Sequence, residues 1–415
     1  MISAARDSGR RVVFTGMGLV SCLGLTLDAV TSSLQEGRSG IRVVPEREAL
    51  GFRSPLSGVL PPFDVKDYMK RKDRKGLSEA AAYASVAVLK AVEHSGGDFG
   101  LFDSERAGII IGNDSSSDQS IYMLDTVRSE RKTTTLGSSL VLKSMTSSPT
   151  INLTPFLKIK GLSLTISAAC ASGAHSTGLA YIMIKSGFLD IALAGGCQEL
   201  NWQSMASFDA LMTFSVRTDE PEKASRPFDR ERDGLIPSGG GAALVLEDLD
   251  HARKRGAHIL AEVVGYGFSS DGTHVTNPDG VGAERCIRMA LKQAGMAPED
   301  VDYINAHATG TLVGDYAEAL AIHSVFKECD TPVSSTKSMT GHECWMAGAS
   351  ELIYSILMIQ EEFIAPNINF TAQGEDEPPI NVVPTTREQP LEVVLSNSFG
   401  FGGTNASLIL SKFHG

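Results

Sequence analysis

One cysteine and two histidines stand at predicted boundaries between elements, and these residue types can together carry acyl-transfer chemistry. Cys170 lies between an apolar strand-like run, residues 162–166, and a run of small residues, 167–174, that can begin a helix. Free backbone N–H groups and the positive end of a helix dipole favour the thiolate, which is the form that attacks thioesters and carbonyls. His307 closes an apolar stretch, residues 301–306, and precedes a turn, whereas His342 follows the segment 334–341, so both stand where a strand gives way to a loop. The three positions predict one active site.

The composition excludes two broad classes of protein. The chain has 415 residues, 42% of them hydrophobic, and a formal net charge of -12, which argues against general nucleic-acid binding. No apolar run approaches the roughly 20 residues that a membrane helix needs, and the N-terminus lacks the apolar core of a signal peptide. We therefore expect a cytoplasmic protein that does not enter the membrane.

The six cysteines are scattered without a CxxC pair, as is usual in a reducing compartment. Apart from Cys170 they are expected to be small buried hydrophobic residues. Cys344, two residues after His342, is the one with a conceivable second role.

Several longer motifs occur in a fixed order along the chain. They are residues 11–20, 36–41, 226–234, 334–342 and 396–405. With the Cys170 segment they resemble the β-ketoacyl-[acyl-carrier-protein] synthases, the decarboxylating condensing enzymes of fatty acid and polyketide synthesis. The similarity is greatest to the chain-elongating bacterial enzymes of type I.

The resemblance implies a fold as well as a reaction. Strand-like and helical runs alternate along the chain, and a Gly-rich turn followed by an apolar strand occurs twice, at 239–247 and 400–410. The family implies a thiolase-like α/β fold in which two duplicated halves stack as five αβαβα layers. The expected halves are 1–255, with the nucleophilic cysteine, and 256–415, with the two histidines.

The family's reaction explains why these residue types are needed. Cys170 would take an acyl group from the phosphopantetheine arm of an acyl carrier protein, and malonyl on a second carrier protein would then lose carbon dioxide. Two imidazole N–H donors, from His307 and His342, suit the negative charge of the resulting enolate. The backbone N–H groups of Cys170 and Phe401 are the expected oxyanion hole for the tetrahedral oxygen. The product would be a 3-oxoacyl thioester of fatty acid elongation.

Five further residues match positions near the family's active site. Lys337 and Glu318 are predicted to form a buried ion pair that holds the histidine loops, although an ordinary structural salt bridge is the alternative. The hydroxyls of Thr309 and Thr311 suit the amides of pantetheine, and plain turn chemistry is the alternative. Glycines in the 400–403 loop, Gly402 among them, allow the backbone to approach the substrate.

One position departs from the family pattern. Relatives usually continue the His342 motif with small residues, whereas this chain reads Glu-Cys-Trp-Met-Ala-Gly over 343–348. Trp345 replaces a glycine, so we expect it to reshape the space for the acyl chain. The alternative is that Trp345 is core packing or part of a dimer contact.

Two basic groups stand out in this acidic chain, and we expect them either to dock the acidic carrier protein or to form a solvated face. They are Lys70, Arg71 and Lys72, and Arg128 and Arg131.

No catalytic metal or bound cofactor is expected, since phosphopantetheine is carried by the partner protein. Some relatives hold a structural Na+ or K+, and the matching oxygen ligands would come from Asn305, Ala306, Glu351, Asn397 and Ser398. We expect a homodimer, with a heterodimer as the alternative.

Other functions fit these residues less well. A non-decarboxylating thiolase should show a second catalytic cysteine and a single active histidine, and a silent chain-length partner should lack the nucleophile. A cysteine hydrolase leaves the second histidine unexplained. The same condensation in aryl polyene, polyunsaturated fatty acid or polyketide assembly stays open.

Overall fold

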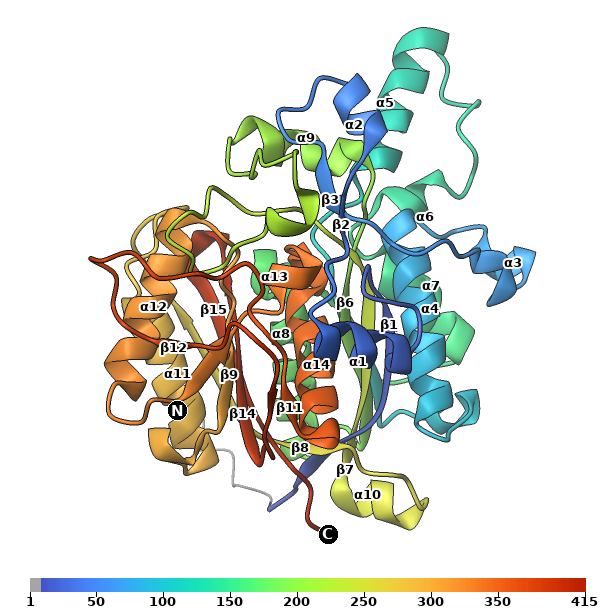
Figure 1. Cartoon of the computed structure of the whole chain (residues 1–415). Coiled ribbons are helices and arrows are strands. Elements are labelled where there is room, and N and C mark those ends of the chain that lie inside the picture. Colours follow the sequence, from blue (N-terminus) through green and yellow to red (C-terminus); the bar gives the residue numbers. More distant parts are fainter. Residues whose placement is uncertain (1–8) are drawn as a thin grey trace.

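The computed structural model describes residues 9–415, and a mixed sheet of eleven strands runs through it (Figure 1). The strands follow the order β12-β10-β9-β14-β15-β8-β1-β7-β6-β4-β5. Their bounds are β1 Val12–Val20, β4 Ala107–Gly112, β5 Ser163–Ile166, β6 Ile191–Gln198, β7 Gly240–Asp248, β8 Ala261–Ser270, β9 Tyr303–Asn305, β10 Pro332–Ser334, β12 Asn381–Val382, β14 Val393–Gly400 and β15 Thr404–Ser411.

The sheet consists of two halves with the same topology. In β1-β7-β6-β4-β5 the first two pairings are antiparallel and the next two are parallel. The series β8-β15-β14-β9-β10 repeats this order and these directions. A short antiparallel pairing of Val12–Phe14 with Ala261–Val263 joins β1 to β8. The chain is therefore an internal duplication.

Glycines at matching places bring a helix against each of the two joining strands. A Cβ atom at Gly16 or Gly18 of β1 would lie 2.3 or 2.2 Å from a carbonyl oxygen of α4 (Glu79–His94). A Cβ atom at Gly265 or Gly267 of β8 would lie 2.5 or 2.0 Å from one of α11 (Val281–Ala294). Each half thus uses two alternating glycines for the same close helix-to-sheet packing.

Helices form the other three layers. α8 (Ser172–Lys185) and α14 (Ala347–Glu361) lie between the two half-sheets, and α14 is buried on every side from Ala347 to Ile359 because it is apolar nearly all round. α4 and α7 (Ser148–Leu157) cover one outer face, and α11 and α12 (Leu312–Phe326) the other. The expected five-layer thiolase-like fold is confirmed.

The expected boundary near residue 255 stays a prediction, and residues 1–8 of the first half lie outside the described residues. The basic connector at 251–256 falls on α10 (Leu249–Lys254), between β7 and β8. Among residues 9–415, no helix combines the length and apolarity needed to cross a membrane.

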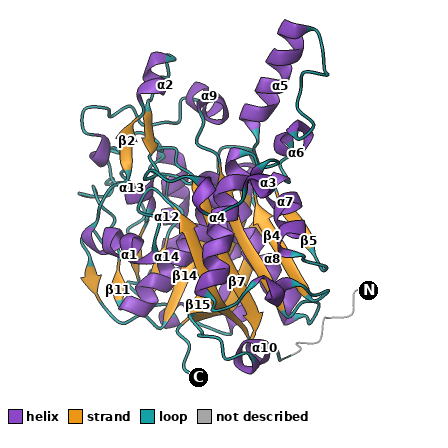
Figure 2. Cartoon of the chain, turned by 90° about the vertical axis from the view of Figure 1, so that its right-hand side faces the viewer, coloured by secondary structure: helices purple, strands orange, loops and turns teal. Residues whose placement is uncertain are grey.

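The remaining elements lie mostly around one end of the layers, where α2, α5 and α9 gather (Figure 2). Their bounds are α1 Leu27–Glu36, α2 Pro45–Ala49, α3 Arg71–Arg74, α5 Ser117–Glu130, α6 Leu140–Ser144, α9 Trp202–Ala210, α13 Lys337–Thr340, β2 Ile41–Val43, β3 Leu56–Gly58, β11 Phe363–Ile364 and β13 Arg387–Glu388.

Candidate active site

Cys170 sits in a tight turn between β5 and α8. A 3₁₀ turn, Ala169–Ala171, follows the strand and runs directly into the helix. Ala169 has a φ of 47°, in the left-handed region that non-glycine residues seldom adopt. The Cys170 side chain is buried. The turn therefore fixes the thiol at the start of a central helix, as the run of small residues predicts.

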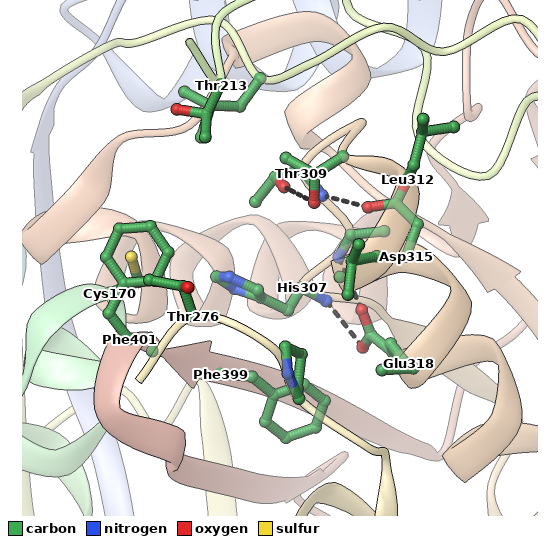
Figure 3. Close-up of a pocket in the computed structure, with 18 of the residues that line it drawn as sticks. Cys170, Thr213, Thr276, His307, Thr309, Leu312, Asp315, Glu318, Phe399 and Phe401 are labelled. Atoms are coloured by element: carbon green, nitrogen blue, oxygen red, sulfur yellow. Dashed lines mark hydrogen bonds between the residues drawn. The ribbon is translucent and has the colours of Figure 1, made fainter. Parts of the chain in front are cut away.

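The second half of the chain brings both histidines to this thiol. His307 follows β9 and His342 follows α13, and both side chains are buried. His342 Nε2 lies 2.9 Å from Cys170 Sγ. The two imidazole rings are 5.2 Å apart and nearly perpendicular, and the sulfur and one nitrogen of each ring lie within 4.8 Å of one another. Three residues far apart in the sequence thus form one cluster (Figure 3 shows Cys170 and His307).

The thiol form of Cys170 is favoured in this structure. Burial raises the pKa of Cys170 to about 12, although Lys337 and the backbone N–H groups of Phe401 and of Cys170 itself lower it. The prediction that the helix start favours the thiolate is therefore wrong for the resting site, because burial outweighs the nearby dipoles. Cys170 must lose its proton during the reaction.

Both histidines are neutral near pH 7. Burial, and then the charge of Lys337, hold the pKa of His307 and of His342 well below the usual range. Nδ1 of each ring has no hydrogen-bond partner among the described residues, so no contact at Nδ1 fixes either tautomer. With its proton on Nδ1, His342 can accept the thiol proton at Nε2. With its proton on Nε2, it can donate to an oxyanion.

Lys337 and Glu318 do not pair with each other, contrary to the sequence-based prediction. Lys337 Nζ contacts Glu351 of α14, and both side chains are buried. Glu318 instead accepts hydrogen bonds from the backbone N–H groups of His307, at 2.9 Å, and Ala308, at 2.7 Å. The pair was mispredicted because Glu351 comes from α14, the buried central helix, whereas Glu318 lies on α12 and holds the loop after β9.

Three buried carboxyl groups lie within the electrostatic reach of Lys337. Burial raises the pKa of Glu318 and Glu343 to about 7 and that of Glu351 to about 8, while Lys337 lowers each of them. Glu343 accepts hydrogen bonds from Ser21 and Tyr354 at 3.0 and 3.1 Å. Lys337 is thus the cation whose charge influences the whole cluster, Cys170 and both histidines included.

The loop after β14 supplies the second backbone donor at the thiol. A Cβ atom at Gly400 would lie 3.1 Å from both Ala168 O and Cys170 N, so a side chain there would push the loop away. This approach lets the Phe401 N–H reach the sulfur. Gly402 makes the left-handed turn of the loop at φ 79° and donates to Val275 O.

A pocket of about 510 Å³ leads from Cys170 to the surface. Thr309 and Thr311 line it, with their hydroxyl oxygens 3.2 Å apart. Figure 3 shows Thr309 on the same wall as His307 and Leu312. Gly402 and Trp345 are not lining residues, although the sequence places both at the substrate.

Trp345 lies behind the pocket wall. It belongs to a small apolar cluster with Cys170 and Cys344, and its ring is 6.1 Å from that of Phe208, which does line the pocket. Its indole Nε1 is buried and has no hydrogen-bond partner among the described residues. Trp345 therefore backs the aromatic wall beside the nucleophile.

The five basic residues predicted for docking are exposed, but they do not surround the pocket. Lys70, Arg71 and Lys72 lie at α3, and Arg128 and Arg131 at the end of α5. Figure 1 places α3 and α5 on the opposite side of the molecule from α12, which lines the pocket. The pocket mouth is apolar instead, with Met212, Val275 and Leu312 each at least 60% exposed.

The residues predicted to bind an alkali ion lie close to one another. Asn305 donates to the carbonyl of Glu351 at 3.4 Å, and Asn305 and Ser396 are neighbours across β9 and β14. Glu351 Oε2 and Ser398 Oγ are buried without a hydrogen-bond partner among the described residues. Two unpartnered oxygens within the predicted set are consistent with an oxygen-ligated monovalent cation. The complete predicted set is Asn305, Ala306, Glu351, Asn397 and Ser398.

Asp315 is a residue that sequence reasoning missed. Its carboxylate accepts hydrogen bonds from the backbone of Thr309, Gly310 and Phe228 at 3.0, 3.1 and 2.8 Å. It thereby shapes the pocket wall that carries Thr309. The signal available in the sequence was an acidic residue in the first turn of a helix that follows a Gly-containing turn.

Comparisons with known proteins agree on one family. The model described as "Beta-ketoacyl synthase, N-terminal domain" matches residues 9–252, and the one described as "Beta-ketoacyl synthase, C-terminal domain" matches residues 260–371. The chain is 42% identical over 409 residues to 3-oxoacyl-[acyl-carrier-protein] synthase 1 of Haemophilus influenzae, covering 98% of this chain and all of that one.

Solved structures agree in fold. A β-ketoacyl synthase from Burkholderia phymatum superposes with a TM-score of 0.92 at 36% identity, over 98% of this chain and all of that one. The ketosynthase AntDE, solved in complex with its type II polyketide acyl-carrier protein, superposes with a TM-score of 0.89 at 30% identity, over 97% of this chain and all of that one.

Proposed function

The chain belongs to the β-ketoacyl synthase family, and from that premise we propose that it elongates fatty acids by condensing an acyl-enzyme with malonyl-[acyl-carrier-protein]. The observation that carries the proposal is the cluster of one cysteine and two histidines, with His342 Nε2 2.9 Å from Cys170 Sγ. A thiolase would need a second catalytic cysteine, and Cys344, the nearest candidate, is buried with its sulfur on the carbonyl of His342 at 3.5 Å.

Acyl transfer is the first step. The acyl carrier protein presents a thioester through the pocket, and Cys170 attacks its carbonyl carbon. A C–S bond forms to Cys170, the bond to the pantetheine sulfur breaks, and the Cys170 proton passes to the leaving sulfur by way of His342 Nε2. The backbone N–H groups of Cys170 and Phe401 stabilise the tetrahedral oxyanion.

Decarboxylation and condensation follow in the same site. After acylation, Cys170 has no proton to donate, so neutral His307 and His342 can both donate N–H to the malonyl thioester oxygen. Carbon dioxide leaves, the enolate carbon attacks the acyl carbon, and the Cys170 thiolate is expelled and takes a proton from water. The product is 3-oxoacyl-[acyl-carrier-protein]. Thr309 and Thr311 would hydrogen-bond the pantetheine arm on its way in.

Separate assays of the two half-reactions test this division of labour. Cys170→Ala should abolish acyl-enzyme formation and condensation but leave malonyl decarboxylation measurable. His307→Ala or His342→Ala should leave Cys170 open to acylation by a reactive acyl donor while slowing decarboxylation roughly a hundredfold or more. Full condensation by any of these variants would refute the assignment, and circular dichroism on each variant shows that it is folded.

The acyl carrier protein is proposed as the macromolecular partner. The exposed apolar residues at the pocket mouth suit an apolar contact with the partner, and AntDE is a relative solved with its carrier protein. The basic groups at α3 and α5 suit an acidic partner, but they lie away from the pocket mouth. No bound cofactor is needed, because the pantetheine arm belongs to the carrier.

A homodimer is proposed from the open edge at β5. β5 ends the strand order and its Leu164 is 40% exposed. The helix α7 packs on β5 and also contacts α6, where Val141 is 62% exposed. Leu164→Lys should convert the dimer to a monomer in multi-angle light scattering. An unchanged mass would refute β5 as the interface, and a second, different chain in the native complex would identify a heterodimer.

We also propose a structural Na+ or K+ held by Glu351, Ser398 and their neighbours, which would tie α14 to β14. Replacing K+ and Na+ with choline should lower the Tm by several degrees, and Ser398→Ala should remove that dependence. We place the reaction in the cytoplasm, which fits six unpaired cysteines.

A further inference from the structure

The two parallel strands β4 and β5 place an acidic residue beside the nucleophile turn. Gly112, the last residue of β4, pairs with Ile166, the last of β5, so the segments that follow emerge side by side. Asp114 follows β4 by two residues. Its Oδ2 accepts the backbone N–H of Ala169 at 3.0 Å, and its Oδ1 accepts the hydroxyl of Ser167. One carboxylate thus holds the turn at the residue directly before Cys170.

The turn needs such support because its backbone is strained. Ala169 has a φ of 47°, and the left-handed conformation is unfavourable for an L-residue with a side chain. Ser172 braces the turn from within, accepting the Ala168 N–H at 2.8 Å and donating to Ala169 O at 2.7 Å. Asp114 braces it from a neighbouring strand, so its hydrogen bond ties the turn to the sheet.

The other side of the same turn meets the oxyanion loop. A Cβ atom at Gly400 would lie 3.1 Å from both Ala168 O and Cys170 N, so this loop lies against the turn with no room for a side chain. A shift of the turn would therefore change the direction of the thiol and its distance from the Phe401 N–H. The histidines come from other segments, after β9 and α13. Loss of the Asp114 contact should therefore affect the chemistry at Cys170 and spare that of the histidines.

We propose that Asp114 is a positioning residue for acyl transfer, which holds the strained turn at Ala169 so that Cys170 is aimed at the incoming thioester. The proposal rests on the proposed function, because it assigns Asp114 to the first of the two half-reactions. Under this proposal, decarboxylation of the malonyl thioester does not need Asp114.

The experiment compares Asp114→Ala with Asp114→Asn and with a matched control, Asp118→Ala. Asp118 is an acidic residue in the first turn of α5, and its Oδ2 accepts a hydrogen bond from the side chain of Gln119 rather than from the Cys170 turn. Single-turnover transfer from acyl-carrier protein to Cys170 is followed by mass spectrometry. Malonyl decarboxylation is followed in a Cys170→Ala background, where no acyl group competes.

Asp114→Ala should slow acylation roughly tenfold to a hundredfold, the effect of a small misplacement of a reacting group, while decarboxylation stays within about twofold. Asp114→Asn should recover most of the rate, because its amide oxygen can still accept the Ala169 N–H. Asp118→Ala should acylate as the parent does.

Three results would overturn the proposal. Acylation by Asp114→Ala at the parent rate would show that the contact has no role. An equal loss of both half-reactions would show a general structural role, as would an Asp114→Asn variant as slow as the alanine. Failure of the parent chain to acylate at all would instead refute the proposed function.

Discussion

Replacing Lys337 with Met should reveal how the buried cation supports the site. The side chain is 1% exposed, and its Nζ contacts Glu351, which is equally buried. Met has a side chain of similar length but no charge, so Glu351 loses its lysine partner. Removing one member of a buried pair costs about 3–5 kcal/mol, so Lys337→Met should lose about that much unfolding free energy. The loss should grow with pH, because burial favours protonated Glu351 and a proton can replace the lost cation at low pH.

A second substitution separates charge from packing. Lys337→Met combined with Glu351→Met removes both charges, and an apolar pair of similar volume is often as stable as a buried ion pair. The double variant should therefore recover most of the stability lost by the single one in urea denaturation at pH 8. A double variant whose loss of unfolding free energy equals the sum of the losses from the two separate substitutions would refute the pairing. A loss of less than about 1 kcal/mol in Lys337→Met alone would refute it too.

The same variants should share one catalytic defect. Burial, and then the charge of Lys337, lower the pKa of His342, so removal of Lys337 raises that pKa in part and His342 becomes protonated at a higher pH. A protonated His342 cannot accept the Cys170 proton. The acylation rate should therefore begin to fall at a higher pH, on the acidic side of its pH profile, in both the single and the double variant. An unchanged pH profile of the acylation rate would show that Lys337 acts through structure alone.

Three further predictions follow from the site. Trp345→Gly empties the space behind Phe208, so it should shift the acyl-chain preference if the indole limits the pocket. If Trp345 only packs the core, the variant should lose about 3–5 kcal/mol of unfolding free energy and its relative rates across acyl-chain lengths should not change. Charge reversal should raise the KM for carrier-bound substrates and weaken the salt dependence of their reaction, whether it is made at Lys70, Arg71 and Lys72 or at Arg128 and Arg131. Small pantetheine thioesters should react as before. An equal loss of activity with carrier-bound substrates and with small thioesters would contradict docking. Glu343 and Glu318 have a pKa raised to about 7 in the folded chain, so each binds a proton that the unfolded chain releases, and this contribution to stability is lost as pH rises through about 7. Unfolding free energy should therefore fall as pH rises from about 4.5 to about 7, less steeply in Glu343→Gln, and a slope identical to the parent's would contradict it.

The fold and the catalytic cluster were predictable because both leave local marks in the sequence. Alternating strands and helices, the repeated Gly-rich turns and the Cys170 segment each occupy a few consecutive residues. The family resemblance then joined segments that the sequence alone keeps apart, and the cluster of Cys170 with His307 and His342 was expected on that basis.

Pairings between distant segments were harder to predict. Lys337 pairs with Glu351 rather than Glu318, because which carboxylate meets the cation depends on how the central helix packs between the sheets. The preference for the thiol was missed for a related reason, since burial of Cys170 depends on both halves of the chain. Asp114 had a weak signal, an acidic residue just beyond an apolar strand, but its contact depends on β4 and β5 being neighbours.

The origin of the site residues in two duplicated halves has a consequence for how the protein is made. The ribosome synthesises Cys170 well before His307, Lys337, His342 and the Phe401 loop. A nascent chain that has reached the β7 region therefore carries the thiol without the groups that activate it. Acyl transfer becomes available when β8 has paired with β1 and α14 has docked beside α8, so completion of the chain itself switches on the nucleophile.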